Sequence, residues 1–97
     1  MKFSVELTKQ ATKDLDKLPK ETLQKISTSL LSLEKNPFPD KKRIKKIQGT
    51  KNPLYRLRID TATDSFRAFY TITPELIIFN LRIVSKKNAD RVLKQYN

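Results

Sequence analysis

The sequence predicts one α+β domain over residues 1–97, with an antiparallel sheet of about four strands, an N-terminal helical hairpin packed on one face and a short C-terminal helix. Apolar residues recur at helical spacing between residues 11 and 33. They alternate with polar residues along 54–59 and 66–72, and a nearly unbroken apolar run covers 76–83. These three patterns predict the element order β-α-α-β-β-β-α.

The N-terminal third begins with alternation and then becomes helical. Apolar residues at positions 3, 5 and 7 alternate with polar ones, which is typical of a half-exposed strand. Thr8 suits the N-cap of a first helix, and Pro19 ends that helix and precedes a second one that begins near Lys20. The apolar stripes expected to face the sheet are Ala11, Leu15 and Leu18 on the first helix and Leu23, Ile26, Leu30 and Leu33 on the second.

The middle of the chain is a loop followed by a lysine-rich run. Two prolines exclude a helix from residues 36–40. Ile44 and Ile47 are the apolar anchors of a short extended segment in the lysine-rich run, and Gly49, the sole glycine, suits a turn with positive φ before the next strand. The turn at residues 60–65 is long for a hairpin, and we expect it to contain a bulge.

The last third is predicted to form an interior strand and a helix. A tight turn at residues 73–75 leads into the apolar strand 76–83, in which Arg82 is the one charge. Residues 85–97 have helical composition, and Ser85 is a suitable cap. The residues spaced to pack one side of this helix are Ala89, Val92, Leu93 and Tyr96.

Three arginines are expected to share one side of the central hairpin. Side chains alternate along a strand, so Arg56 and Arg58 face away from Tyr55, Leu57 and Ile59. In the register that keeps apolar residues together, Arg67 of the next strand joins them on one open sheet surface. Phe69 shares this surface and is the candidate for stacking on a base, whereas Tyr55 and Tyr70 are expected in the core.

The charge of the chain indicates a polyanionic partner. The formal net charge is +11, and residues 35–58 hold nine basic residues against one acidic residue. The absence of cysteine and histidine excludes disulfides, thiolate or imidazole catalysis and Cys/His zinc sites. Glu6 interrupts the place where a signal peptide needs an apolar run, so we expect a cytoplasmic protein without a membrane partner.

The ordered set of motifs resembles the RelE/ParE superfamily of toxin-antitoxin proteins, and its RelE branch most closely. The matching residues are 46–49 (KIQG), 54–59 (LYRLRI) and 66–70 (FRAFY), followed by an apolar strand and a basic tail. The resemblance implies a toxin that cleaves mRNA in the ribosomal A site without a metal or other cofactor and so inhibits translation. It also implies a cognate antitoxin, for which we expect an acidic or amphipathic segment.

The resemblance carries the family's catalytic basic residues to Arg56, Arg58 and Arg67. After the last strand the family usually has His-Arg and then Tyr, where this chain reads SKKNAD, and Lys86 supplies the arginine's charge. The arginines suit phosphate binding and transition-state stabilisation, and either Lys86 or Lys46 is a candidate for proton transfer because neighbouring cations lower a lysine pKa. Residues expected to contact RNA or the ribosome are Lys41, Lys42, Arg43, Lys45, Lys46, Lys51, Phe69, Arg82 and Lys87.

The sequence leaves two questions open, the position of Arg82 and the function of the chain. Arg82 either shares the cationic face or pairs with Asp60 or Asp64. The chain is either a nuclease, a ParE-like toxin that inhibits DNA gyrase by binding, or a non-catalytic relative that binds RNA or the ribosome. The three arginines favour the nuclease, because ParE-like members generally lack them.

Overall fold

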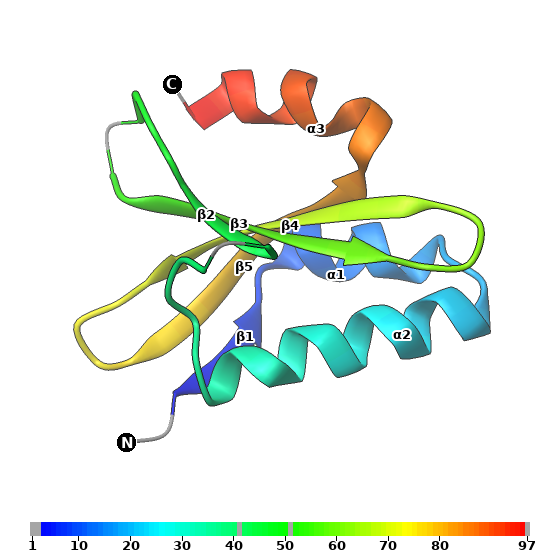
Figure 1. The fold of residues 1–97 in the computed structure, drawn as a ribbon, viewed down its shortest axis with the longest axis horizontal. Helices are drawn as coiled ribbons and strands as arrows, with labels where there is room; N and C mark the ends of the chain where they lie inside the picture. The colour runs from blue at the N-terminus through cyan, green and yellow to red at the C-terminus, as the bar shows by residue number, and fades with distance from the viewer. Residues whose placement is uncertain (1–2, 41, 51, 97) are drawn as a thin grey trace.

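The computed structural model describes residues 3–40, 42–50 and 52–96. Figure 1 shows one sheet between two helical layers. The elements in chain order are β1 (Ser4–Leu7), α1 (Lys9–Asp16), α2 (Lys20–Leu31), β2 (Ile44–Ile47), β3 (Leu54–Asp60), β4 (Ser65–Ile72), β5 (Ile77–Ser85) and α3 (Lys86–Leu93), with short 3₁₀ helices at Ser32–Glu34 and Lys94–Tyr96.

The sheet confirms the α+β class and corrects two details of the expected topology. In the described part of the chain it has five strands in the order β1-β5-β4-β3-β2. The extended segment at Ile44–Ile47 is a full edge strand, because it pairs with β3 in antiparallel register. The sheet is mixed rather than antiparallel, since β1 lies beside β5 and runs parallel to it.

The helical hairpin packs on one face of the sheet as predicted (Figure 1). Its expected stripe residues lie in the main core, with Ala11, Ile26 and Leu33 fully buried. The alternating apolar residues of β3 and β4 meet them from the sheet, and Tyr55 stacks on Tyr70 at a centroid distance of 5.5 Å. Burial of this one face therefore selects the register of the central hairpin.

The other face of the sheet is not fully open, because α3 lies across it (Figure 1). The side of α3 predicted to pack does so, and Ala89 and Val92 form a second buried cluster with Leu54 and Phe69. Leu93 and Tyr96 pack against this cluster. The face that carries the arginines is consequently apolar at one end and cationic at the other.

Local geometry confirms most of the predicted turns and caps. The Oγ1 of Thr8 accepts the Ala11 N–H at 3.1 Å, and Gly49 has φ +82°. The β3–β4 hairpin pairs without interruption from Tyr55–Tyr70 to Asp60–Ser65, so the bulge expected in its turn is absent. A register shift occurs instead between β4 and β5, where Phe69 and Tyr70 face Arg82 and Asn80 and leave Leu81 as an extra residue.

The expected cap of the C-terminal helix differs from the structure in its hydrogen bonding. Ser85 stands at the N-cap of α3, but its side chain makes no capping hydrogen bond. Its Oγ instead accepts from the Nδ2 of Asn88 at 3.3 Å.

In the part of the chain described here, no helix is long and apolar enough to cross a membrane.

Candidate nucleic-acid interface

The strand register brings the predicted arginines together. Arg58 is the direct Cα partner of Arg67, and Arg56 faces Phe69 on the same side of the sheet. Lys45 of β2 is the Cα partner of Arg56, so a second pair of like charges lies two residues along β3 from the Arg58–Arg67 pair. Like charges placed directly opposite one another destabilise a sheet, and an anion bound between them would remove that repulsion.

Two residues that the sequence reasoning missed hold these arginines in place. The Nε of Arg58 contacts Asp60 Oδ2 at 3.1 Å. Ser65 Oγ donates to Asp60 Oδ1 at 2.6 Å and accepts from Arg67 Nη1 at 2.8 Å. Arg67 Nη1 also contacts the carbonyl oxygen of Phe66 at 3.0 Å. Asp60 and Ser65, which close the β3–β4 turn, thus orient both guanidinium groups.

The environment of the arginines leaves their charge incompletely compensated. Arg67 is only 7% exposed. Its pKa is lowered, first by burial and then by the positive charges of Arg56 and Arg58, while Asp60 acts in the opposite direction. The Nε of Arg56 is buried and has no hydrogen-bond partner among the described residues. Because arginine keeps its proton in proteins, these groups are fixed donors that would favour an incoming phosphate.

Lys86 lies at the arginine end of the sheet, whereas Lys46 does not. Val84 is the Cα partner of Arg67 and Ser85 is that of Phe66, so Lys86 follows two residues after the partner of Arg67. Lys86 and Lys87 are exposed and form the first turn of α3, where the helix dipole favours anions over cations. Lys46 pairs with Tyr55 and therefore belongs to the opposite face of the sheet. Only Lys86 keeps its place as the candidate for proton transfer.

Phe69 does not have the accessible position that base stacking requires. Its side chain is 1% exposed and lies beneath α3 with Ala89 and Val92. It shares the face of the arginines as expected, but the apolar side of α3 covers this part of the face. Phe69 is a core residue in this structure, and its ring is not exposed for stacking on a base.

Arg82 pairs with neither Asp60 nor Asp64, the two partners considered from the sequence. Its Nε and Nη2 contact the two carboxylate oxygens of Asp14 on α1 at 2.9 and 3.2 Å. Asp14 Oδ2 also accepts the backbone N–H of Ile83 at 2.9 Å. Asp14 therefore caps the edge of β5 beyond the end of β1, and its carboxylate holds the partly buried guanidinium of Arg82.

The lysine-rich segment presents its charges around a fixed turn. Asp40 Oδ1 accepts the backbone N–H groups of Lys42, Arg43 and Ile44 at 3.0, 2.6 and 3.0 Å, and these bonds lower the pKa of its carboxyl group. Lys42, Arg43 and Lys45 are exposed. Arg58 N donates to Arg43 O at 2.8 Å, which joins this segment to the arginine strand. The predicted contacts Lys41 and Lys51 lie outside the described residues.

Most of the chain is similar to known toxin sequences. Residues 5–89 match the family model described as the ParE toxin of the type II toxin-antitoxin system parDE. The chain is 35% identical over 90 residues to a protein of Methanocaldococcus jannaschii named "Putative toxin RelE1", a match that covers 92% of this chain and 94% of the relative.

Two solved structures have a similar fold. The archaeal RelE–RelB complex from Pyrococcus horikoshii contains a chain that matches with a TM-score of 0.70 and 28% identity, over 89% of this chain and 97% of that chain. A mutant of the Escherichia coli toxin RelE in the free state matches with a TM-score of 0.73 and 18% identity, over 99% and 95% of the two chains. The second likeness concerns the fold alone.

Proposed function

Because the chain belongs to the RelE/ParE family of type II toxin-antitoxin toxins, we propose that it is a ribosome-dependent endoribonuclease that cleaves mRNA in the A site and so inhibits translation. The observation that supports this activity best is the direct pairing of Arg58 with Arg67, with Arg56 on the same side of the sheet. Three guanidinium groups arranged in this way offer several fixed donors to one phosphate.

The proposed mechanism divides the work between these cations. The 2′-hydroxyl of the RNA attacks the adjacent phosphate and displaces the 5′-oxygen of the next nucleotide. Arg67 stabilises the negative charge that develops on the phosphate, and Arg56 and Arg58 bind its oxygens. Lys86 transfers a proton, to the leaving oxygen or from the attacking hydroxyl. The ribosome orients the RNA, since this chain has no histidine to supply a strong general base.

A cognate antitoxin is the proposed regulator. The similar archaeal RelE was solved in a complex with RelB. For this chain we expect an acidic or amphipathic antitoxin segment that lies over the basic surface formed by Lys42, Arg43, Lys45, Arg56 and Arg58. By neutralising these charges, it would prevent the toxin from entering the ribosome.

Inhibition of DNA gyrase is the second candidate function. It is favoured by the family model that matches residues 5–89, which is described as a ParE toxin. This activity would need binding alone and would give the arginines no catalytic role. The buried, hydrogen-bonded position of Arg67 favours the nuclease, because a guanidinium used only for surface attraction does not need a fixed orientation.

Translation of a defined mRNA in a reconstituted ribosomal system tests the proposal. Mapping the 5′ ends of the fragments should reveal cuts in the A site, and Arg67→Ala should reduce their rate by about 100-fold or more. Arg91→Ala is the matched control, because Arg91 is an exposed arginine on α3 whose Nη2 donates to Asn88 Oδ1 at 3.3 Å. Intact mRNA with normal translation would favour gyrase inhibition, and blocked translation of intact mRNA would indicate ribosome binding without cleavage.

A further inference from the structure

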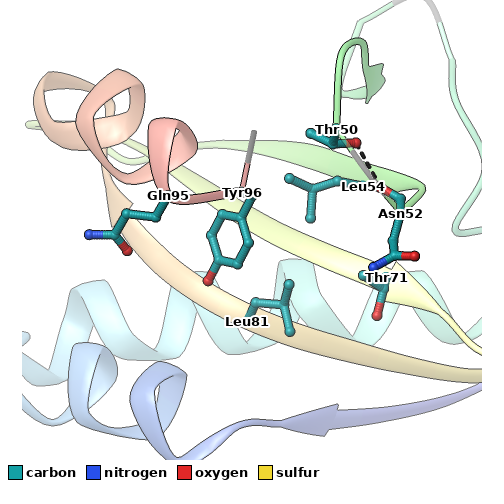
Figure 2. A pocket seen from close by; sticks show the side chains of 7 residues that line it. All are labelled: Thr50, Asn52, Leu54, Thr71, Leu81, Gln95 and Tyr96. Atoms are coloured by element: carbon teal, nitrogen blue, oxygen red, sulfur yellow. Dashed lines mark hydrogen bonds between the residues drawn. The ribbon is translucent and has the colours of Figure 1, made fainter.

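A pocket of about 510 Å³ lies on the same face as the arginines, at the opposite end from Lys86. Figure 2 shows Leu81 at its floor, Tyr96 on one side and Leu54 and Asn52 on the other. Thr50, Thr71 and Gln95 complete the lining. The β2–β3 connection, the sheet and the C-terminal 3₁₀ turn therefore build this pocket together.

The pocket lies further along the same two strands that carry the arginines. Leu54 precedes Arg58 by four residues on β3, and Thr71 follows Arg67 by four residues on β4, with Arg56 and Lys45 between the two ends. At about 3.4 Å per residue, the pocket is roughly 14 Å from the Arg58–Arg67 pair. A dinucleotide of extended single-stranded RNA spans such a distance. A phosphate on the arginines and a neighbouring base in the pocket can therefore belong to one strand.

The lining combines an aromatic ring with unused polar groups. The side-chain amides of Asn52 and Gln95 and the hydroxyl of Tyr96 make no hydrogen bond within the described part of the chain, whereas Thr50 Oγ1 donates to the carbonyl oxygen of Asn52 at 2.7 Å. An amide offers both donors and acceptors, as the edge of a nucleobase does. The ring of Tyr96 is half-buried against the second core cluster, so its orientation is restrained before any ligand arrives.

We propose that this pocket binds one nucleobase of the RNA that the arginines hold, with the base stacked on Tyr96 and its edge contacted by Asn52 and Gln95. Single-stranded RNA is commonly bound in this way, by an aromatic ring and by hydrogen bonds to exposed base edges. An apolar antitoxin side chain would fit the floor of the pocket but would leave the amides without partners. The inference deepens the proposed function by adding a base-binding subsite to the phosphate site.

Binding of short single-stranded RNA to the purified protein tests this subsite without ribosomes or cleavage. Fluorescence anisotropy at one fixed salt concentration should show weaker binding of an abasic oligonucleotide than of the same oligonucleotide with its bases. Tyr96→Ala should weaken binding of the base-bearing oligonucleotide by about 5- to 100-fold and leave binding of the abasic one unchanged. Tyr96→Phe should retain the affinity because it keeps the ring.

One control and one further pocket variant separate base binding from general effects. Phe38→Ala removes a 50% exposed ring that packs against Phe3 away from the pocket, and should leave both affinities unchanged. Asn52→Ala alters an exposed side chain, so it tests the pocket even if Tyr96→Ala weakens the fold. We expect it to reduce only the affinity for the base-bearing oligonucleotide.

The possible results distinguish this inference from the proposed nuclease activity. Equal affinity for the two oligonucleotides would overturn the base subsite, as would an equal loss of both affinities in Asn52→Ala. Weaker binding of the antitoxin alone in the two pocket variants would assign the pocket to that protein instead. Base-dependent binding by a protein that cuts no mRNA would uphold the subsite while refuting the nuclease.

Discussion

Arg58 and Arg67 face each other across the β3–β4 ladder, and both connect to Asp60, directly at 3.1 Å for Arg58 and through Ser65 for Arg67. The carboxylate of Asp60 lies next to the β3–β4 turn, on the side of both guanidinium groups that faces this turn. Hydrogen bonding from Ser65 and then the charge of Arg58 lower the pKa of Asp60, so it stays ionised at neutral pH. Asp60 orients the pair and also competes with a phosphate for it.

Asp60→Asn should increase the affinity for single-stranded RNA. The change keeps a side chain of the same shape but removes the negative charge beside Arg58 and Arg67, so we expect roughly two- to fivefold tighter binding. Log affinity against log salt should become steeper by about 0.7, as expected when one further cation meets the RNA. Asp64→Asn is the matched control, since Asp64 stands in the same turn and accepts from Ser65 N rather than from an arginine. Unchanged affinity and slope in Asp60→Asn would show that Asp60 does not compete.

Asp40→Asn should reduce thermal stability at neutral pH and lose that effect in acid. Backbone hydrogen bonds lower the folded-state pKa of Asp40 below its ordinary value of 3.8. The stabilisation is therefore present above about pH 3.8 and disappears as the pH falls through the lowered pKa. Melting temperatures of the variant and the original chain should converge toward pH 2. Glu75→Gln, which changes an exposed carboxylate in the β4–β5 turn, should show no such convergence; a constant gap for Asp40→Asn would contradict the prediction.

Asp14→Ala should destabilise the fold by about 3 kcal/mol, measured by urea unfolding. The substitution leaves Arg82 without its partner and the N–H of Ile83 without an acceptor at the edge of β5. Asp16→Ala, on the exposed side of the same helix, should change the free energy of unfolding by no more than about 0.5 kcal/mol. Similar losses in both variants would indicate that helix α1, rather than the contact with β5, is affected.

Phe69→Ala should lower the free energy of unfolding by about 3–5 kcal/mol, because it leaves a cavity beneath α3. Phe38→Ala removes the same ring from a site that is 50% exposed and should have a much smaller effect. Where the Phe69 variant remains folded, its RNA affinity should equal that of the original chain. A selective loss of RNA affinity in folded Phe69→Ala would return this residue to the binding surface.

The sequence by itself determined the elements and the two sides of the central hairpin. Helical spacing, the Thr8 cap, the break at Pro19 and the positive φ of Gly49 are local properties, since each depends on residues within one or two turns of the chain. Alternation along β3 and β4 also assigned the arginines to one side, because only one register buries the apolar residues. The main core and the shared face of Arg56, Arg58 and Arg67 could therefore be predicted, whereas the direct pairing of Arg58 with Arg67 came from the structure.

Only the tertiary structure decided which parts of that arginine face stay accessible. The partner of Arg82 is Asp14, separated from it by 68 residues, and no local pattern encodes this contact. The burial of Phe69 depends on where α3 crosses the sheet, and the pairing of β1 with β5 depends on which edge the completed hairpins leave free. Such contacts are set by the packing of whole elements, so a pattern read along the chain can place a residue on a face without showing what covers it.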